Sequence, residues 1–158
     1  KKIMKKALLL IGCPEAPAQT PMTIYTAYKL RQIGYDVTIS SNPAASKLIK
    51  VSDPEKNYIQ KMVNIDSFID NLEENDFDLL VGIIHKDAAV SFFVTYYHLL
   101  NTKSMAIIFQ RDQDLVDDFV EQVKENTDAE IISAKAYHNP TPVRVKVDKA
   151  LKQLEGEE

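Results

Sequence analysis

Cysteine, tryptophan and glycine are scarce in this sequence of 158 residues, which has one cysteine, no tryptophan and four glycines. A single thiol cannot form an internal disulfide, so a secreted scaffold held together by disulfides is excluded. A cytoplasmic location is therefore the default expectation. No apolar run is long enough to span a bilayer, so no membrane segment is predicted.

The sequence also lacks the excess of positive charge that nucleic-acid-binding proteins usually carry. It has 19 basic and 23 acidic residues, a net charge of −4, which argues against nucleic acid as a partner. Lys1 to Lys6 followed by the apolar residues 7–11 has the order of a signal peptide. The apolar run is short and no small-residue cleavage site follows, so a first strand is predicted there instead. The absence of an initiator methionine suggests a processed or trimmed start.

What remains is the composition of an ordinary globular domain. Apolar residues make up 45% and charged residues 27% of the chain, values typical of soluble proteins. The length suits one hydrophobic core, and no repeat, low-complexity tract or flexible linker divides it. We therefore expect residues 1–158 to form a single domain.

The strands that the sequence predicts are short and mostly apolar. Continuous apolar runs are typical of parallel strands that helices cover on both faces. The first, third and fourth predicted strands are such runs, whereas the second alternates and the fifth is more polar. The five strands are predicted at residues 7–11, 37–40, 78–84, 104–109 and 129–136.

Helix start signals, in which a capping residue precedes proline, alternate with these strands. They occur at Thr20-Pro21, Asn42-Pro43, Asp53-Pro54 and Thr141-Pro142, and the first residue of each pair is expected to be the N-cap. The helix that begins at Thr20 should end before a left-handed Gly34. After Thr141, a short strand over residues 143–147 competes with the last helix.

Alternating strands and helices predict right-handed crossovers between parallel strands. The expected fold class is therefore α/β: a Rossmann-like, three-layer α/β/α domain with a doubly wound, mainly parallel sheet of about five strands. Residues 42–77 are too many for one crossover helix. We expect a helical insertion there, with helices near residues 43–50, after Asp53-Pro54 and near residues 66–74. An ordinary elaboration is favoured over a lid.

The segment from Ala88 to Leu100 is apolar or aromatic on nearly every side. A helix without a polar face is buried all round, so we expect a homodimer through the Ala88–Leu100 helix. Burial under the insertion at residues 42–77 is the alternative. His98 lies within this helix and is expected to be a core or interface histidine.

A ligand site is expected beyond the carboxyl ends of the strands, where open α/β sheets bind their ligands. Polar and reactive side chains follow the predicted strands at this edge. The residues expected to bind a small-molecule ligand there are Glu15, Gln19, Thr20, Asn42, Lys86, Arg111, Tyr137, His138 and Asn139.

Cys13 is the main candidate for a catalytic residue, with His85 as its partner. It precedes a helix N-terminus, where positive potential or a nearby His85 lowers the pKa of a thiol. The alternative is a small buried residue that closes the first strand. No C-x-x-C motif is present, which excludes a dithiol. Cys13, Glu15, His85 and His138 lack recognised metal-motif spacing, so no metal site is predicted.

Phosphate binding by the loop after the first strand is disfavoured. A dinucleotide fingerprint needs several glycines, but this loop has only Gly12. Pro14, Pro17 and Pro21 each lack an N–H donor. Lys86 and Arg111 would then have to hold a nucleotide, although a solvated surface role suits them better. The sequence identifies no cofactor.

The segments LLLIGCPEAPAQTP and NPAASKLIKVSDPEKNYI resemble a family of small archaeal proteins of unknown function found in methanogens. The likeness covers most of the chain and implies a Rossmann-related α/β/α fold, a methanogen's cytoplasm and a dimer. It implies no activity and no functional residues. The sulfur-relay domains of the DsrE type also pair an α/β sheet with a reactive cysteine, but Cys13 does not match their pattern.

The sequence therefore predicts first a small-molecule-binding domain with its site at the carboxyl edge of the sheet. A thiol-dependent enzyme or sulfur carrier that uses Cys13 is the first alternative. A structural subunit that docks a partner through the Ala88–Leu100 helix is the second.

Overall fold

Six parallel strands form the central sheet in the computed structural model, which describes residues 4–157. Their order is β3-β2-β1-β4-β5-β6, and each neighbouring pair is parallel. The mainly parallel, doubly wound α/β fold is confirmed, with six strands where about five were expected. The strands are β1 (Lys5–Ile11), β2 (Tyr35–Ser41), β3 (Lys61–Asn64), β4 (Leu79–Ile84), β5 (Lys103–Gln110) and β6 (Glu130–Lys135).

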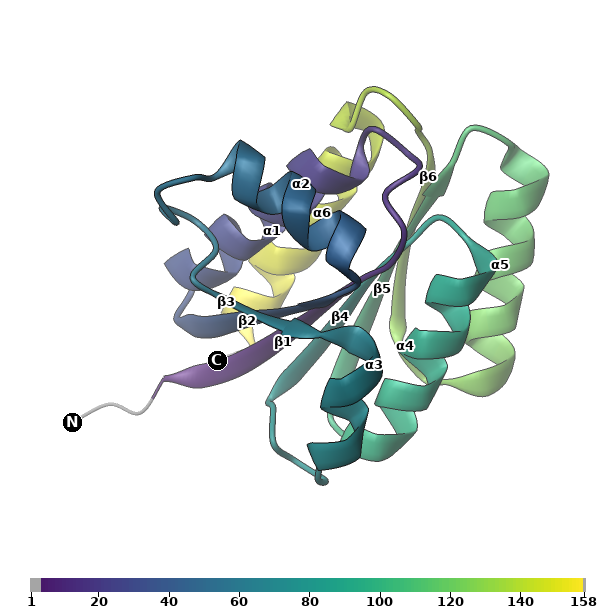
Figure 1. Cartoon of the computed structure of the whole chain (residues 1–158). Helices are drawn as coiled ribbons and strands as arrows, with labels where there is room; N and C mark the ends of the chain where they lie inside the picture. Colours follow the sequence, from purple (N-terminus) through teal and green to yellow (C-terminus); the bar gives the residue numbers. More distant parts are fainter. Residues whose placement is uncertain (1–3, 158) are drawn as a thin grey trace.

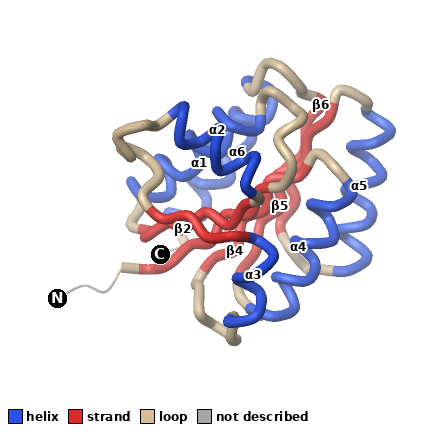
Figure 2. Tube along the Cα trace, in the orientation of Figure 1, coloured by secondary structure: helices blue, strands red, loops and turns tan. Residues whose placement is uncertain are grey.

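Helices cover both faces of this sheet (Figures 1 and 2). One layer contains α1 (Gln19–Gln32), α2 (Pro43–Ser52) and α6 (Thr141–Gly156). The other contains α3 (Ile65–Phe68), the 3-10 helix η1 (Ile69–Asn71), α4 (Asp87–Leu100) and α5 (Gln113–Asn126). The chain changes layers between β3 and β4, so the strand order reverses beside β1.

The central strand β1 shows why the run from Ala7 to Ile11 is apolar throughout. Leu8 and Leu10 pack into the core under α4 and α5, whereas Ala7, Leu9 and Ile11 pack into the core under α1 and α6. Each of these five residues is therefore buried on one side of the sheet or the other, as expected of a parallel sheet between two helical layers, whereas Lys5 and Lys6 at the start of the strand are exposed.

The segment at residues 42–77 contains a strand, so its prediction as a purely helical insertion is wrong. The edge strand β3 lies within it. Helix α2 forms as expected, but no helix follows Asp53. The buried Asp53 carboxylate instead accepts hydrogen bonds of 2.8, 3.0 and 2.8 Å from the N–H groups of Asn57, Tyr58 and Ile59. The helix expected at residues 66–74 is reduced to α3 and η1.

Besides Asp53, two more predicted N-caps are wrong. Ala18, not Thr20, is the N-cap of α1, and its N–H donates to the carbonyl of Tyr137 at 2.8 Å. Thr141 is the first residue of α6 rather than its cap, and its N–H donates to Asn139 Oδ1 at 3.0 Å. Residues 143–147 are helical, so the competing strand does not form. Gly34 follows α1 with φ of 103°.

Helix α4 has a solvent-exposed face, unlike the all-round burial that was expected. Val90, Phe93 and Tyr96 are buried against the sheet, but Ser91 and Thr95 are exposed. Side chains of α3 and η1 pack into the same core as α4. His98 is exposed in this chain, with a ring nitrogen 3.0 Å from the carbonyl oxygen of Asn126. Within residues 4–157, no helix has the length and apolar character needed to pass through a bilayer.

Candidate functional site

The reversal in strand order places the carboxyl ends of β1 and β4 side by side at the centre of the sheet. Ile11 lies opposite Ile83 across the two strands, so the loop that contains Cys13 begins next to the loop that contains His85. The loops after β5 and β6 continue the same edge. This position, next to the point where the strand order reverses, is where doubly wound sheets bind ligands.

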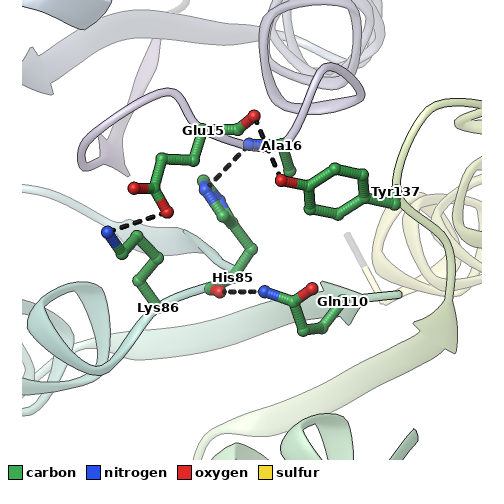
Figure 3. A network of polar contacts seen from close by, with 6 residues as sticks. All are labelled: Glu15, Ala16, His85, Lys86, Gln110 and Tyr137. Atoms are coloured by element: carbon green, nitrogen blue, oxygen red, sulfur yellow. Dashed lines mark hydrogen bonds and ion pairs between the residues drawn. The ribbon is translucent and has the colours of Figure 1, made fainter. Parts of the chain in front are cut away.

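His85 forms a hydrogen bond that holds the loop of residues 12–18 against the carboxyl edge of the sheet. Its Nε2 accepts a hydrogen bond of 3.1 Å from the N–H of Ala16 (Figure 3). Its ring stacks on Phe109. The side chain is buried, and burial lowers the pKa of His85 to about 4, against a smaller opposing effect of Glu15. The imidazole is therefore neutral near pH 7.

The hydrogen bond from Ala16 also fixes the tautomer of His85. Because Nε2 accepts, the single proton of the neutral ring is on Nδ1. Nδ1 is buried and has no hydrogen-bond partner among residues 4–157. A buried donor without a partner is rare in folded proteins and marks a place where a further polar group would be stabilised.

Glu15 and Lys86 form an ion pair across the mouth of this loop, with 2.8 Å between Oε2 and Nζ (Figure 3). Their hydrogen bond lowers the pKa of the Glu15 carboxyl and raises the pKa of the Lys86 ammonium. Both side chains are substantially exposed, so the pair adds little stability. It does join the loop after β1 to the loop after β4.

Tyr137 brings the loop after β6 into the same cluster. Its carbonyl accepts from the N–H of Ala18 at 2.8 Å, and its hydroxyl lies 3.4 Å from the carbonyl oxygen of Glu15. The guanidinium of Arg111 stacks over the ring, with Cζ 3.9 Å from the ring centroid. His138 is exposed and lies edge-on to Tyr137.

Gln110, which sequence reasoning did not select, connects β5 to β4. Its Nε2 donates to the carbonyl of His85 at 2.9 Å, and its Oε1 accepts from the N–H of Arg111 at 2.8 Å. Phe109, which stacks on His85, was missed as well. A polar residue that ends an apolar strand was the available signal for Gln110, whereas nothing in the sequence distinguishes Phe109 from its apolar neighbours.

Cys13 is exposed and free, so the alternative of a small buried residue closing the first strand is wrong. It lies close enough to Lys86 to contribute to the raised pKa of that ammonium, after the larger effect of Glu15. The thiol is therefore open to solvent.

Besides Glu15, Lys86 and Tyr137, three of the expected ligand-binding residues form side-chain hydrogen bonds within the protein. Gln19 is buried and donates from Nε2 to the carbonyl of Gly12 at 3.0 Å. Asn42 caps α2 by accepting from the N–H of Ala45, and Asn139 accepts from the N–H of Thr141. Thr20 is half-buried in the first turn of α1. The exposed edge is formed instead by Cys13, Glu15, Lys86, Arg111, Tyr137 and His138.

The loop of residues 12–18 has few backbone donors to offer a phosphate. The N–H groups of Glu15, Ala16 and Ala18 are hydrogen-bonded within the protein. Pro14 and Pro17 have no N–H. The cradle of free amides that binds phosphate in dinucleotide folds is therefore not built here. Nor do residues 4–157 contain a group of three or more His, Cys, Asp and Glu side chains placed to hold a metal ion.

Comparison with known proteins shows strong similarity to two of them. A solved structure titled "Structure of MT0777" shares 46% sequence identity and superposes with a TM-score of 0.92, covering 94% of this chain and 98% of that one. The uncharacterised protein MJ0452 of Methanocaldococcus jannaschii is 35% identical over 153 residues, which are 96% of this chain and 100% of that protein.

More distant structures share the fold alone. An FMN-dependent UbiX-like decarboxylase from Escherichia coli O157:H7 superposes with a TM-score of 0.57 at 10% identity, covering 96% of this chain and 94% of that one.

Residues 8–150 match the family DUF1890, described as a domain of unknown function. The resemblance to small archaeal proteins is thus confirmed, and the chain belongs to the DUF1890 family.

Proposed function

We propose that this chain is a small-molecule-binding domain whose site is the carboxyl edge of the sheet, from β1 across β4 and β5 to β6. The convergence of four separate loops on this edge carries the proposal. Glu15 meets Lys86, His85 meets Ala16, and Arg111 meets Tyr137. Charged and aromatic side chains that converge at such a position are the usual components of a ligand site.

A flavin nucleotide is the ligand that the distant decarboxylase suggests, because that protein is FMN-dependent. The loop of residues 12–18 fits a nucleotide phosphate poorly, since the N–H groups of Glu15, Ala16 and Ala18 are hydrogen-bonded internally and Pro14 and Pro17 have no N–H. We therefore do not extend FMN to this chain.

Native mass spectrometry of the protein purified from its own host tests the proposal directly. We expect a bound small molecule that is lost on denaturation. Added back to 15N-labelled protein, it should shift the amide signals of residues 12–18 and 85–87. The signals of residues 71–78, at the opposite end of β4, are the matched control. A bound molecule that shifts only the control residues, or protein with no bound molecule, contradicts the proposal.

A thiol-dependent activity is the second candidate, and the exposure of Cys13 at this edge of the sheet is the observation that favours it. A thiolate reacts with iodoacetamide, whereas a thiol does not. We expect Cys13 to alkylate faster at neutral pH than glutathione does, and Lys86→Gln to slow the reaction, with Lys135→Gln as the control. A rate no faster than that of glutathione excludes an activated thiol.

We further propose a cytoplasmic location for this protein and a homodimer that forms through α4.

A further inference from the structure

The three arginines of this chain differ in how their guanidinium groups are bound. Arg31 donates from Nη1 to the carbonyls of Asn57 and Tyr58, at 3.0 and 3.4 Å. Arg144 forms an ion pair of 2.7 Å with Asp148. Among residues 4–157, Arg111 is the arginine whose guanidinium has no oxygen acceptor, although it lies at the proposed ligand edge.

Arg111 is nevertheless held in place. Its guanidinium stacks on Tyr137, which is itself joined to the loop after β1 through Ala18. The backbone N–H of Arg111 donates to Gln110 Oε1. Stacking uses the flat face of a guanidinium and leaves the N–H donors along its edge available. The group is therefore an ordered set of donors without an acceptor.

The surroundings of Arg111 define the charge that it can accept. Lys86, another cation at this edge, is already paired with Glu15. Asp112, the next residue in the chain, caps α5 by accepting from the N–H of Asp114 at 2.9 Å. The loop of residues 12–18 adds few backbone donors. The Arg111 guanidinium, with one positive charge and a planar pair of N–H donors, is therefore the group that this edge presents to a ligand.

We propose that Arg111 binds a carboxylate of the ligand, so that the site takes a carboxylic acid and not a nucleotide or phosphate ester. This inference rests on the proposed function and names its ligand class. A guanidinium can form two parallel hydrogen bonds with a carboxylate or with a phosphate, but its single charge is cancelled by a carboxylate and not by a phosphate dianion. A phosphate dianion needs further donors, which nucleotide sites supply from backbone amides.

The NMR signals of the arginine side chains test this inference. With three arginines, the Nε–Hε region contains three signals, which Arg→Lys variants assign. We expect succinate to shift the Arg111 signal saturably and to leave Arg31 and Arg144, the internal controls, unmoved. Inorganic phosphate and FMN at matched ionic strength should shift it little. Arg111→Gln should abolish saturable binding, and Arg111→Lys should weaken it about tenfold through loss of the paired hydrogen bonds.

Tyr137 separates a stacked, ordered guanidinium from a mobile one. Tyr137→Phe keeps the ring and should retain succinate binding, whereas Tyr137→Leu should weaken it, with Tyr28→Leu as a control for loss of an exposed tyrosine. Phosphate binding as tight as succinate would overturn the choice of carboxylate. The absence of a saturable Arg111 shift with succinate would overturn the inference about Arg111. If the molecule from the host shifts residues 12–18 but not Arg111, this inference fails while the proposed function stands.

Discussion

The buried imidazole of His85 links the stability of the domain to pH. In the unfolded chain the pKa of histidine is near 6.5, whereas burial lowers the pKa of His85 to about 4. The unfolded state therefore binds more protons between these pH values, and stability falls as the pH falls. Protonation of Nε2 also removes the acceptor for the N–H of Ala16, so the same proton loosens the loop of residues 12–18.

We expect the free energy of unfolding to decrease as the pH is lowered from 6.5 toward 4, and His85 to contribute up to about 3 kcal/mol of that loss. Above pH 6.5 its contribution is fully present. Urea unfolding at a series of pH values measures this dependence. His85→Gln should flatten the curve, whereas His98→Gln, which removes an exposed imidazole, should leave it unchanged. Parallel curves for the wild type and His85→Gln would contradict the assignment.

The sequence predicted the position of a site residue only where it also predicted the end of the strand before that residue. Cys13, Lys86 and Arg111 follow apolar runs, so their common edge could be inferred. Their pairing could not, because it depends on register and loop shape. That Glu15 reaches Lys86, and that Tyr137 lies under Arg111, follows from tertiary structure alone. Gln19 and Asn42 looked equally available but bind backbone groups.

Packing between β4 and α4 depends on a single missing methyl group. A Cβ built on Gly82 overlaps the ring of Phe93, which is fully buried. We expect Gly82→Ala to lower the free energy of unfolding by about 2 kcal/mol, the usual effect of overpacking a core. Chemical denaturation of the purified variant measures this loss.

Gly12→Ala is the matched control for Gly82→Ala. A Cβ on Gly12 would lie 3.7 Å from the Cβ of Ala89, an ordinary contact, so its effect should be small. The double variant Gly82→Ala with Phe93→Leu should recover part of the stability relative to the sum of the single changes. Additive losses would show that the two residues do not meet.

The elements that sequence reasoning found are those with a strong local signal. Apolar runs predicted β1, β4 and β5, because burial on both faces requires them. The strand β3 was missed because its four residues lie at the sheet edge and are half-buried or exposed, which leaves no apolar run. Asp53-Pro54 has the form of a helix start, but the same carboxylate can organise a turn, and here the turn forms.

At the scale of the whole molecule, the exposed face of α4 is the surface proposed to meet a second copy. Ala88, Ser91, Thr95 and Leu99 are exposed and follow helical spacing. Small side chains at three of these positions allow close approach of another helix. We expect Thr95→Lys to shift the protein from dimer to monomer in sedimentation velocity, because it places two like charges at a two-fold contact.

Gln153→Lys is the control for this change, since it adds the same charge on α6 in the opposite layer. It should leave the sedimentation coefficient unchanged. Wild-type protein that sediments as a monomer at all concentrations would refute the dimer. Equal effects of the two variants would place the contact elsewhere.

The position of β1 in the sheet has a consequence for synthesis of the protein. β1 is made before β2, β3 and β4, yet it pairs with β4, whose residues begin at Leu79. While the ribosome is still adding residues 42–77, one side of this apolar strand has no hydrogen-bonding neighbour. Such an open edge recruits strands from other nascent chains. Chaperone demand should therefore be highest between the synthesis of β1 and the emergence of β4 from the exit tunnel.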